Sequence, residues 1–337
     1  MKRLATSVLA SRPVSALASR YFGIGIPIFM VHRIKTDNQF ISGISQEHLR
    51  NCLRYLVEEG YCFLSLESII QSLRNRQPLP ENAVVFTMDD GYLDQAHFAS
   101  PIFLEFNCPV TFFVITGMLD QKLWPWDSQV SWIIENSEKS VIKVTLSDEV
   151  IHMDIDDVPK KHQARRRIRD IMKEMDAELT HASICQLSHA AGTPVPEAAP
   201  VPYQALDWDI ARDLEKKGIR FAPHSRTHRI LAKLDRGAVE SEIRGSWETM
   251  TSNLVSPLKI FCYPTGRKLD FGPREIDILK NEGFLGAVST IPGYITNNIS
   301  REEQLFCLPR FELPTSMSLL IQYCSWLEYA KWKHGKY

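Results

Sequence analysis

Residues 83–92 read AVVFTMDDGY, an apolar, β-branched run that ends in two carboxylates and a glycine. This composition predicts a buried strand over residues 83–88. Gly91 permits a sharp turn after the strand. Because neighbouring strand residues point to opposite faces, Asp89 and Asp90 are placed for two different roles. The alternative is a plain turn into a helix whose N-terminus favours negative charge.

The same strand pattern recurs outward from this segment, and helical patterns separate the repeats. The further strands are predicted at residues 26–31, 110–115, 219–222, 258–263, 285–289 and 305–308. The helices are predicted at residues 46–59, 66–76, 94–106, 207–217, 236–253 and 273–282. Short strands that alternate with helices predict an α/β fold with a mainly parallel sheet, open or closed into a barrel.

One polar segment, residues 124–206, interrupts this alternation. It contains a strand-like pair at 141–146 and 149–155, followed by a basic helix from 159 to about 180 and a proline-rich loop. We interpret it as an insertion into the α/β domain rather than an independent domain. An amphipathic helix is expected over residues 1–25 and a C-terminal helix over 316–337.

The composition excludes several classes of protein. A net charge of −1 over 337 residues gives no basic field for nucleic acid, and 44% hydrophobic residues are ordinary for a globular protein. No apolar stretch is long enough for a transmembrane segment. The seven cysteines are scattered without a CxxC pair, which is typical of buried thiols in a reducing compartment. A cytoplasmic location is therefore expected, although the N-terminus leaves export open and the oligomeric state is undetermined.

Two histidines follow a second predicted strand. His224 and His228 are four residues apart, so they are expected on one side of a helical turn, close enough to share a cation. Parallel-sheet enzymes place their sites at the carboxyl ends of strands. Two histidines and an aspartate leave one coordination position open, as in catalytic zinc sites. With Asp89 available as a general base, the pattern indicates hydrolysis of an amide or ester.

These segments resemble a known family. Residues 87–91, Thr-Met-Asp-Asp-Gly, are similar to the Thr-Phe-Asp-Asp-Gly motif of the polysaccharide deacetylases, the NodB-homology group of carbohydrate esterase family four. Residues 224–228 match that family's His-Ser/Thr-x-x-His, and 261–266 resemble its third motif. Residues 30–33 are similar to the Tyr-His-Arg that opens many bacterial members. The resemblance runs in order from residue 26 to about 314.

The resemblance implies a distorted, incomplete (β/α) barrel over residues 26–315, interrupted by the insertion at 124–206. It also implies an enzyme that removes N-acetyl groups from an N-acetylhexosamine-containing glycan or glycan precursor. The usual metal of the family is zinc, and cobalt or nickel serves some members.

The resemblance also assigns roles to individual residues. Asp89 matches the catalytic base, while Asp90, His224 and His228 match the metal ligands. Thr265 occupies the place whose backbone N–H helps to hold the oxyanion.

Three departures from the family pattern are visible. Met88 replaces the common phenylalanine, which is expected to be a tolerated packing change. Cys262 stands where many members have an arginine that orients the base, so nothing in that motif visibly tunes Asp89. Residues 308–311, Leu-Pro-Arg-Phe, replace the Leu-x-x-His that supplies a general acid. His32 is the best substitute for that acid, but it could equally be a hydrogen-bonded structural histidine. Arg310 could bind an anionic group or the substrate carbonyl, but it cannot act as an ordinary acid.

Substrate contacts are therefore expected from Arg310 and from the third motif, through Tyr263, Pro264, Thr265 and Gly266. The missing acid histidine keeps two alternatives open. One is a hydrolase of small or cyclic non-sugar amides, and the other is a glycan-binding relative without turnover.

Overall fold

The computed structural model describes residues 21, 23, 25–36, 41–147, 149–175, 179–297 and 302–335. The helix expected over residues 1–25 lies almost entirely outside the described residues. Within them, no helix combines the length and apolar character needed to cross a membrane.

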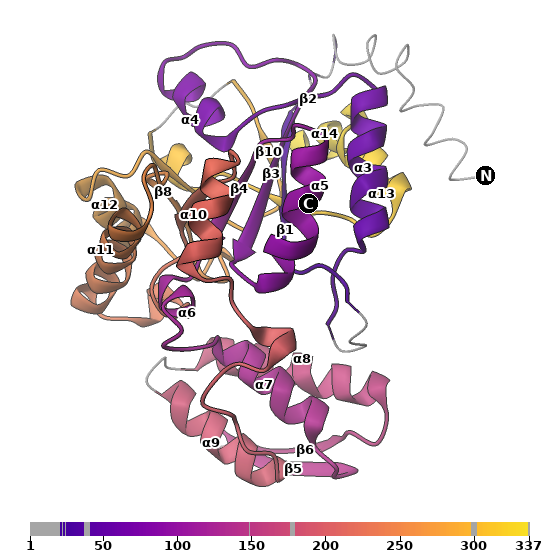
Figure 1. Cartoon of the computed structure of the whole chain (residues 1–337), viewed down its shortest axis with the longest axis vertical. Helices are drawn as coiled ribbons and strands as arrows, with labels where there is room; N and C mark the ends of the chain where they lie inside the picture. The colour runs from indigo at the N-terminus through magenta and orange to yellow at the C-terminus, as the bar shows by residue number, and fades with distance from the viewer. Residues whose placement is uncertain are drawn as a thin grey trace.

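A mostly parallel sheet forms the centre of the molecule (Figure 1). Its strand order is β10 (Tyr294–Ile295), β1 (Ile26–Val31), β3 (Ala83–Asp90), β4 (Val110–Val114) and β7 (Arg220–Pro223). β2 (Cys62–Phe63) pairs with β3, β11 (Phe311–Glu312) pairs with β1, and only β10 runs antiparallel to its partner. β3 lies between β1 and β4, so its carboxyl end is central to the sheet.

The sheet curves into an incomplete barrel. β8 (Ile260–Cys262) and β9 (Gly286–Val288) form a separate parallel pair. A single hydrogen bond, from the Leu258 N–H to the Phe221 carbonyl at 2.7 Å, links this pair to β7. On the other side, the Leu308 N–H donates to the Ala287 carbonyl at 2.9 Å, just before β11 returns to β1. Isolated bonds replace full ladders at both joins, which is the distorted barrel that the family resemblance implies.

Helices cover the barrel and connect its strands. They are α3 (Gln46–Glu58), α4 (Leu66–Arg74), a π-helical turn (Gln95–Ala99), α5 (Ser100–Glu105), α6 (Thr116–Leu119), α10 (Trp208–Lys216), α11 (Arg236–Asn253), α12 (Pro273–Asn281), α13 (Met317–Tyr323) and α14 (Trp326–Lys333). Ser45, Ser65, Asp207 and Asp235 accept backbone N–H groups as N-caps. The caps explain why these helices begin where the polar-to-apolar pattern predicted.

The alternation along β3 divides its side chains between two apolar cores. Phe86 and Met88 belong to one buried cluster and Val85 to the other. By the same alternation, Asp89 points to the side of Val85 and Thr87. Both faces of β3 are buried, as is typical of a parallel strand covered on two sides.

The insertion builds a third apolar core of its own. It consists of α7 (Trp126–Asn136), the antiparallel pair β5 (Val141–Leu146) and β6 (Glu149–Asp154), α8 (Val158–Glu174) and α9 (Thr180–Ala191). Figure 1 shows these elements grouped at one end of the molecule, away from α3 and α4.

Three predicted elements were wrong. The strand expected at 305–308 is a 3-10 turn, Glu302–Phe306, and only Leu308 bridges to Val288. The helix expected from 159 to about 180 ends at Glu174, because Met175 turns to an extended conformation. The single helix expected over 316–337 is divided at Ser325, whose extended backbone separates α13 from α14. Hydrophobic periodicity is read over a window of many residues, so it does not detect a break at one or two positions.

Candidate active site

The two carboxylates separate at the end of β3. Asp89 is 1% exposed and continues the strand, whereas Asp90 has φ of 82° and Gly91 follows with φ of 90°. Two successive residues with positive φ turn the chain sharply, and a non-glycine residue in this region is uncommon. A Cβ at Gly91 would also lie only 3.0 Å from side-chain atoms of Leu119 and Val114. The turn places the two carboxylates in different surroundings.

A loop after β7, not a helical turn, brings the two histidines together. Ser225 and His228 both have positive φ, 63° and 60°, so the expected helical geometry is wrong. The His228 N–H donates to Ser225 Oγ at 3.0 Å, and the two imidazole centroids are 4.8 Å apart. Glu242, buried on α11, accepts the N–H groups of Arg226 and Thr227 at 2.9 Å each. This carboxylate fixes the loop from the barrel side.

Asp90, His224 and His228 converge as the metal-ligand prediction requires. Asp90 Oδ1 lies 3.5 Å from His224 Nε2 and 3.6 Å from His228 Nε2. Ligand atoms around a tetrahedral zinc with bonds of about 2.0–2.1 Å are about 3.4 Å apart, so these distances fit a zinc-sized cation. His224 Nδ1 lies 2.8 Å from the Cys262 carbonyl. This bond fixes the tautomer with Nε2 unprotonated and turned toward Asp90.

The electrostatics of this triad also suit a cation. Burial, together with Asp127 and Asp89 and despite His32, raises the pKa of Asp90 to about 7. Burial and the neighbouring His228 lower the pKa of His224 to about 3. Burial likewise lowers the pKa of His228. Neutral imidazoles beside a carboxylate that is difficult to ionise alone form a donor set that a divalent cation stabilises.

A buried arginine holds Asp89. Arg310 is fully buried, and its Nη1 and Nη2 donate to Asp89 Oδ1 and Oδ2, both at 2.7 Å. Its remaining donors contact Thr87 Oγ1, the Ser289 carbonyl and Cys262 Sγ. Burial opposes ionisation of Asp89, but the guanidinium overrides it and holds the pKa of Asp89 below its usual range. The carboxylate is therefore ionised and fixed in orientation.

This pair corrects two sequence-based interpretations. Arg310 was expected to contact substrate, but it has no exposed surface and its donors are engaged. Cys262 was taken to leave Asp89 untuned, whereas Arg310 supplies the guanidinium from the segment just before β11. The sequence signal was a lone arginine among Leu308, Pro309 and Phe311, since a charge in an apolar run needs a buried partner.

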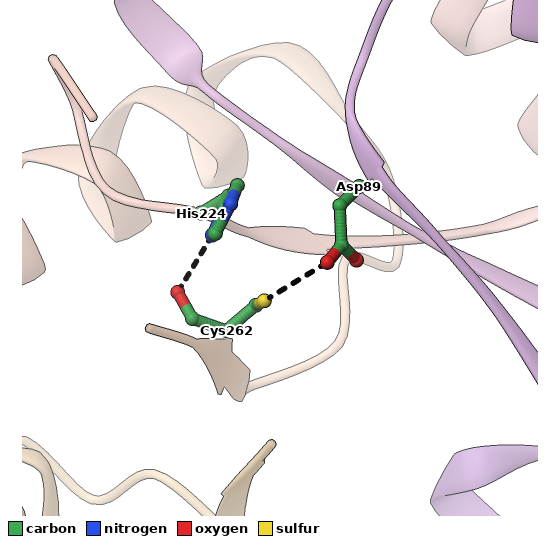
Figure 2. A group of neighbouring side chains, drawn as sticks. All are labelled: Asp89, His224 and Cys262. Atoms are coloured by element: carbon green, nitrogen blue, oxygen red, sulfur yellow. Dashed lines mark hydrogen bonds between the residues drawn. The ribbon is translucent and has the colours of Figure 1, made fainter. Parts of the chain in front are cut away.

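A second cluster, Asp89, His224 and Cys262, is less suited to a metal (Figure 2). Cys262 Sγ lies 3.7 Å from Asp89 Oδ2, and the same residue's carbonyl accepts from His224. Burial raises the pKa of the Cys262 thiol well above its ordinary value, so it is protonated. Metals bind the thiolate, and Asp89 is already neutralised by Arg310. We interpret this cluster as the support that joins the base to the first histidine.

His32 lies at the mouth of the site, directly after β1. Its Nε2 is 3.6 Å from Asp89 Oδ2, and its side chain is 39% exposed. Gln95 Nε2 donates to the His32 carbonyl at 2.6 Å, which anchors the backbone while the ring is left at the cavity wall. The exposure and the reach to Asp89 fit a residue that exchanges protons with substrate.

The third motif contributes backbone more than side chains. The Tyr263 ring is buried, stacks on Phe271 with the ring centroids 3.9 Å apart and donates its hydroxyl to the Phe306 carbonyl, although Tyr263 also lines the cavity. Its expected contact with substrate stays a prediction. Pro264 and Gly266 are also buried. Thr265 lines the cavity with φ of 55°. Its N–H has no acceptor within the described part of the chain, as an oxyanion donor requires.

A cavity of about 150 Å³ contains these groups. The barrel residues that line it are His32, Asp89, Asp90, His224, His228, Tyr263, Thr265, Arg267 and Thr290. The insertion adds Trp126 and Asp127 from α7 and Arg169 and Lys173 from α8. A neighbouring cavity of about 300 Å³ shares His32, Asp90, Asp127 and Arg169 with it. The sequence did not indicate the contribution of Asp127, Arg169 and Lys173, because three separated charged positions on two helices form no motif.

Comparisons with known proteins agree with this site. A family model described as polysaccharide deacetylase matches residues 143–284, which include both histidines and the third motif. Poly-beta-1,6-N-acetyl-D-glucosamine N-deacetylases of Escherichia coli K12 and O157:H7 are each 34% identical over 96 residues, 28% of this chain. The match spans only 14% of the length of those proteins.

Solved structures show the fold. The Streptococcus pyogenes deacetylase PplD in complex with acetate superposes with a TM-score of 0.57 at 17% identity, over 87% of this chain and 94% of that one. IcaB from Ammonifex degensii gives 0.56 at 16% identity, over 92% and 98%. A de-N-acetylase from Aggregatibacter actinomycetemcomitans also gives 0.56 at 16% identity, over 88% and 99%.

Proposed function

We propose that this chain, whose residues 143–284 match the polysaccharide deacetylase family model, is a metal-dependent hydrolase that removes N-acetyl groups from an N-acetylhexosamine-containing glycan or glycan precursor. The observation that carries the proposal is the convergence of Asp90, His224 and His228 beside the ionised Asp89 in one cavity. The name of the E. coli relatives supports an N-acetylglucosamine polymer as the first substrate to test.

Asp90, His224 and His228 are the residues that would hold a divalent cation. We infer zinc, with cobalt or nickel as alternatives, since two imidazoles and a carboxylate suit all three. Such a cation would supply Lewis-acid polarisation of the acetamide carbonyl and acidify water.

The chain's own groups then divide the proton transfers. Asp89 accepts the proton of the attacking water, and Arg310 keeps that carboxylate ionised and oriented. The Thr265 N–H donates to the oxyanion that forms on the carbonyl oxygen. His32 donates a proton to the leaving amine, because Arg310, the other candidate, is buried and always charged.

The test is acetate release from β-1,6-linked N-acetylglucosamine oligomers by zinc-loaded protein. Asp89→Asn removes the base while it keeps the side-chain volume, and loss of about 100-fold or more in kcat is expected. His32→Gln should lower kcat with little change in zinc content, since His32 is not a ligand.

Three results would contradict the proposal. Acetate release that is unchanged in Asp89→Asn would exclude Asp89 as the base. Turnover of cyclic amides without turnover of any glycan would favour the non-sugar hydrolase, and zinc binding without turnover of either would favour a binding protein.

A further inference from the structure

Three cationic side chains line one side of the catalytic cavity, two from the insertion and one from the barrel. Arg169 and Lys173 lie one helical turn apart on α8, and Arg267 faces them from the barrel loop after β8. All three line the same cavity as the metal-ligand triad. Asp89, Asp90 and Asp127 line the same cavity, so the ligand that it attracts depends on which cation keeps an unmatched charge.

Two of the three cations are neutralised by the protein itself. Arg169 Nη2 contacts Asp127 Oδ2 at 3.2 Å. Arg267 contacts Asp270 at 2.9 Å and Glu174 at 3.1 Å, the latter across the gap between barrel and insertion. These guanidiniums are held in place, and their charges are matched by carboxylates.

Lys173 is different, because its charge is only weakly compensated. Its nearest carboxylate oxygen is Asp170 Oδ1, at 4.0 Å, on a side chain that is 64% exposed. Within the described part of the chain, the Lys173 ammonium donates no hydrogen bond. The Lys173 side chain is nevertheless only 20% exposed. A half-buried ammonium without a close partner is destabilising unless something else supplies the counter-charge.

The surroundings increase this imbalance. Burial, followed by repulsion from Arg169, lowers the pKa of Lys173, although Asp170 and Asp127 act in the opposite direction. An ordinary surface lysine would extend into solvent, whereas this one lines the cavity that contains His224 and His228. An anion in the cavity would relieve the imbalance at a short distance from the metal site.

We propose that Lys173 is a specificity-determining residue that selects substrates with a carboxylate or phosphate group on, or next to, the acetylated sugar. The inference rests on the proposed deacetylase function and adds an anionic substrate class to it. Arg169 and Arg267 flank the subsite and fix its shape, and Lys173 supplies the unmatched charge.

The test is calorimetric binding of three probes to the zinc-loaded protein: N-acetylglucosamine, N-acetylmuramic acid and N-acetylglucosamine 1-phosphate. The two anionic probes should bind about tenfold more tightly than the neutral sugar, which is the strength expected of a partly buried ion pair. Lys173→Met should remove about five- to tenfold of that affinity for both anionic probes and leave the neutral sugar unchanged. Lys143→Met, at an exposed position on β5 of the same insertion, is the matched control and should change none of the three.

A second variant, in which the charge is reversed, distinguishes loss of the anion subsite from loss of folding. Lys173→Glu places a carboxylate between Arg169 and Arg267, so the variant should fold and should lose the preference for anions altogether. Equal affinity of wild-type protein for neutral and anionic probes, or an equal loss for all three in Lys173→Met, overturns the proposal. A phosphate preference that survives in both Lys173 variants also overturns it, since phosphate would then bind the zinc alone.

Acetate release measured in the same samples separates the two proposals. The protein could prefer anionic probes through Lys173 and yet release no acetate from any probe or oligomer. That result counts against the deacetylase proposal and supports the anion subsite. Acetate release without anion preference supports the deacetylase and overturns the subsite.

Discussion

The Asp89–Arg310 pair shows how a single contact sets the chemistry of the candidate site. Two opposite charges are fully removed from water, and each is satisfied by a bidentate arrangement with both bonds at 2.7 Å. Removing one partner leaves an uncompensated buried charge, which destabilises the fold far more than replacing both partners with apolar residues does. The pair is thus both a structural element and the device that keeps the base ionised.

Arg310→Met should therefore lose both stability and activity. Removing one partner of a buried pair destabilises by about 3–5 kcal/mol, measured as the free energy of unfolding in denaturant. The pKa of Asp89 should rise, because burial then acts without the guanidinium, so the fraction of active base falls at neutral pH. Activity should accordingly recover as the pH is raised.

The double variant Asp89→Asn with Arg310→Met separates the two effects. It removes both charges, so it should regain part of the lost stability without regaining turnover. Arg244→Met, which breaks an exposed pair with Glu282, is the surface control and should change stability by less than about 1 kcal/mol. If Arg310→Met were as mild as this control, the assigned role of the buried pair would be wrong.

At the scale of single elements, the ends of strands and the loops after them build the site. β3 supplies two carboxylates because a left-handed turn at Asp90 and Gly91 ends it. The loop after β7 supplies two histidines because Glu242 on α11 accepts hydrogen bonds from the loop's backbone N–H groups and holds the loop in place. Neither segment is a helix, and both depend on one packed neighbour.

Glu242→Gln should weaken metal binding without removing any ligand. Both backbone N–H groups of the loop bond Oε2, while Oε1 accepts from Thr227 Oγ1 and Arg229 Nη2. An amide NH2 group in place of one oxygen cannot accept from the groups on that side, so the variant cannot keep all four contacts. Loss of such an outer partner typically lowers metal affinity by about 10- to 100-fold, measurable by competition with a chelating dye.

Glu240→Gln is the matched control for this experiment. It lies on the same helix and pairs with Arg236 at the surface, away from the histidine loop. Equal zinc affinity in Glu242→Gln, Glu240→Gln and wild-type protein would show that the loop is fixed by other contacts.

At the scale of the whole molecule, a barrel and an insertion with separate apolar cores meet at the cavity. A cation held by Asp90, His224 and His228 binds only the folded chain, because the unfolded chain does not hold these three groups together. Metal binding therefore adds to global stability by mass action, by about 2.7 kcal/mol at a free metal concentration of 100 times Kd.

This stabilisation should depend on pH through Asp90. Its pKa is about 7 in the metal-free folded protein, above its ordinary value of 3.8. Below about pH 7 the folded protein thus holds a proton that the metal must displace, and zinc affinity should fall about tenfold per pH unit. The same shift means that this group makes the metal-free protein less stable as the pH rises from about 4 to 7.

The measurement is the zinc-induced change in Tm from pH 5 to 8. The increase should be largest at pH 8 and should shrink below pH 7, and His228→Ala should abolish it at every pH. His224 should not set this dependence, because burial lowers its pKa to about 3, and burial also lowers the pKa of His228. A Tm increase that is constant from pH 5 to 8 would contradict the protonation of Asp90.

The sequence by itself determined the alternation of strands and helices, the ends of most of these elements and the residues of the metal triad. Each of these depends on neighbouring positions: side-chain periodicity, a serine or aspartate cap, or two acids and a glycine at a strand end. Even the four-residue histidine spacing was informative, although the geometry predicted for it was wrong.

Only the tertiary structure decided what surrounds that triad. Arg310 reaches Asp89 across 221 residues of chain, and Lys173 of the insertion faces Arg267 of the barrel. Such pairs have no local sequence pattern, because their members are far apart in the chain. Apolar packing elsewhere brings the distant segments together, and the charged partners meet as a result. The candidate metal ligands and the candidate base were therefore identified from short sequence motifs, while the ionisation of Asp89 and Asp90 depends on packing between distant parts of the chain.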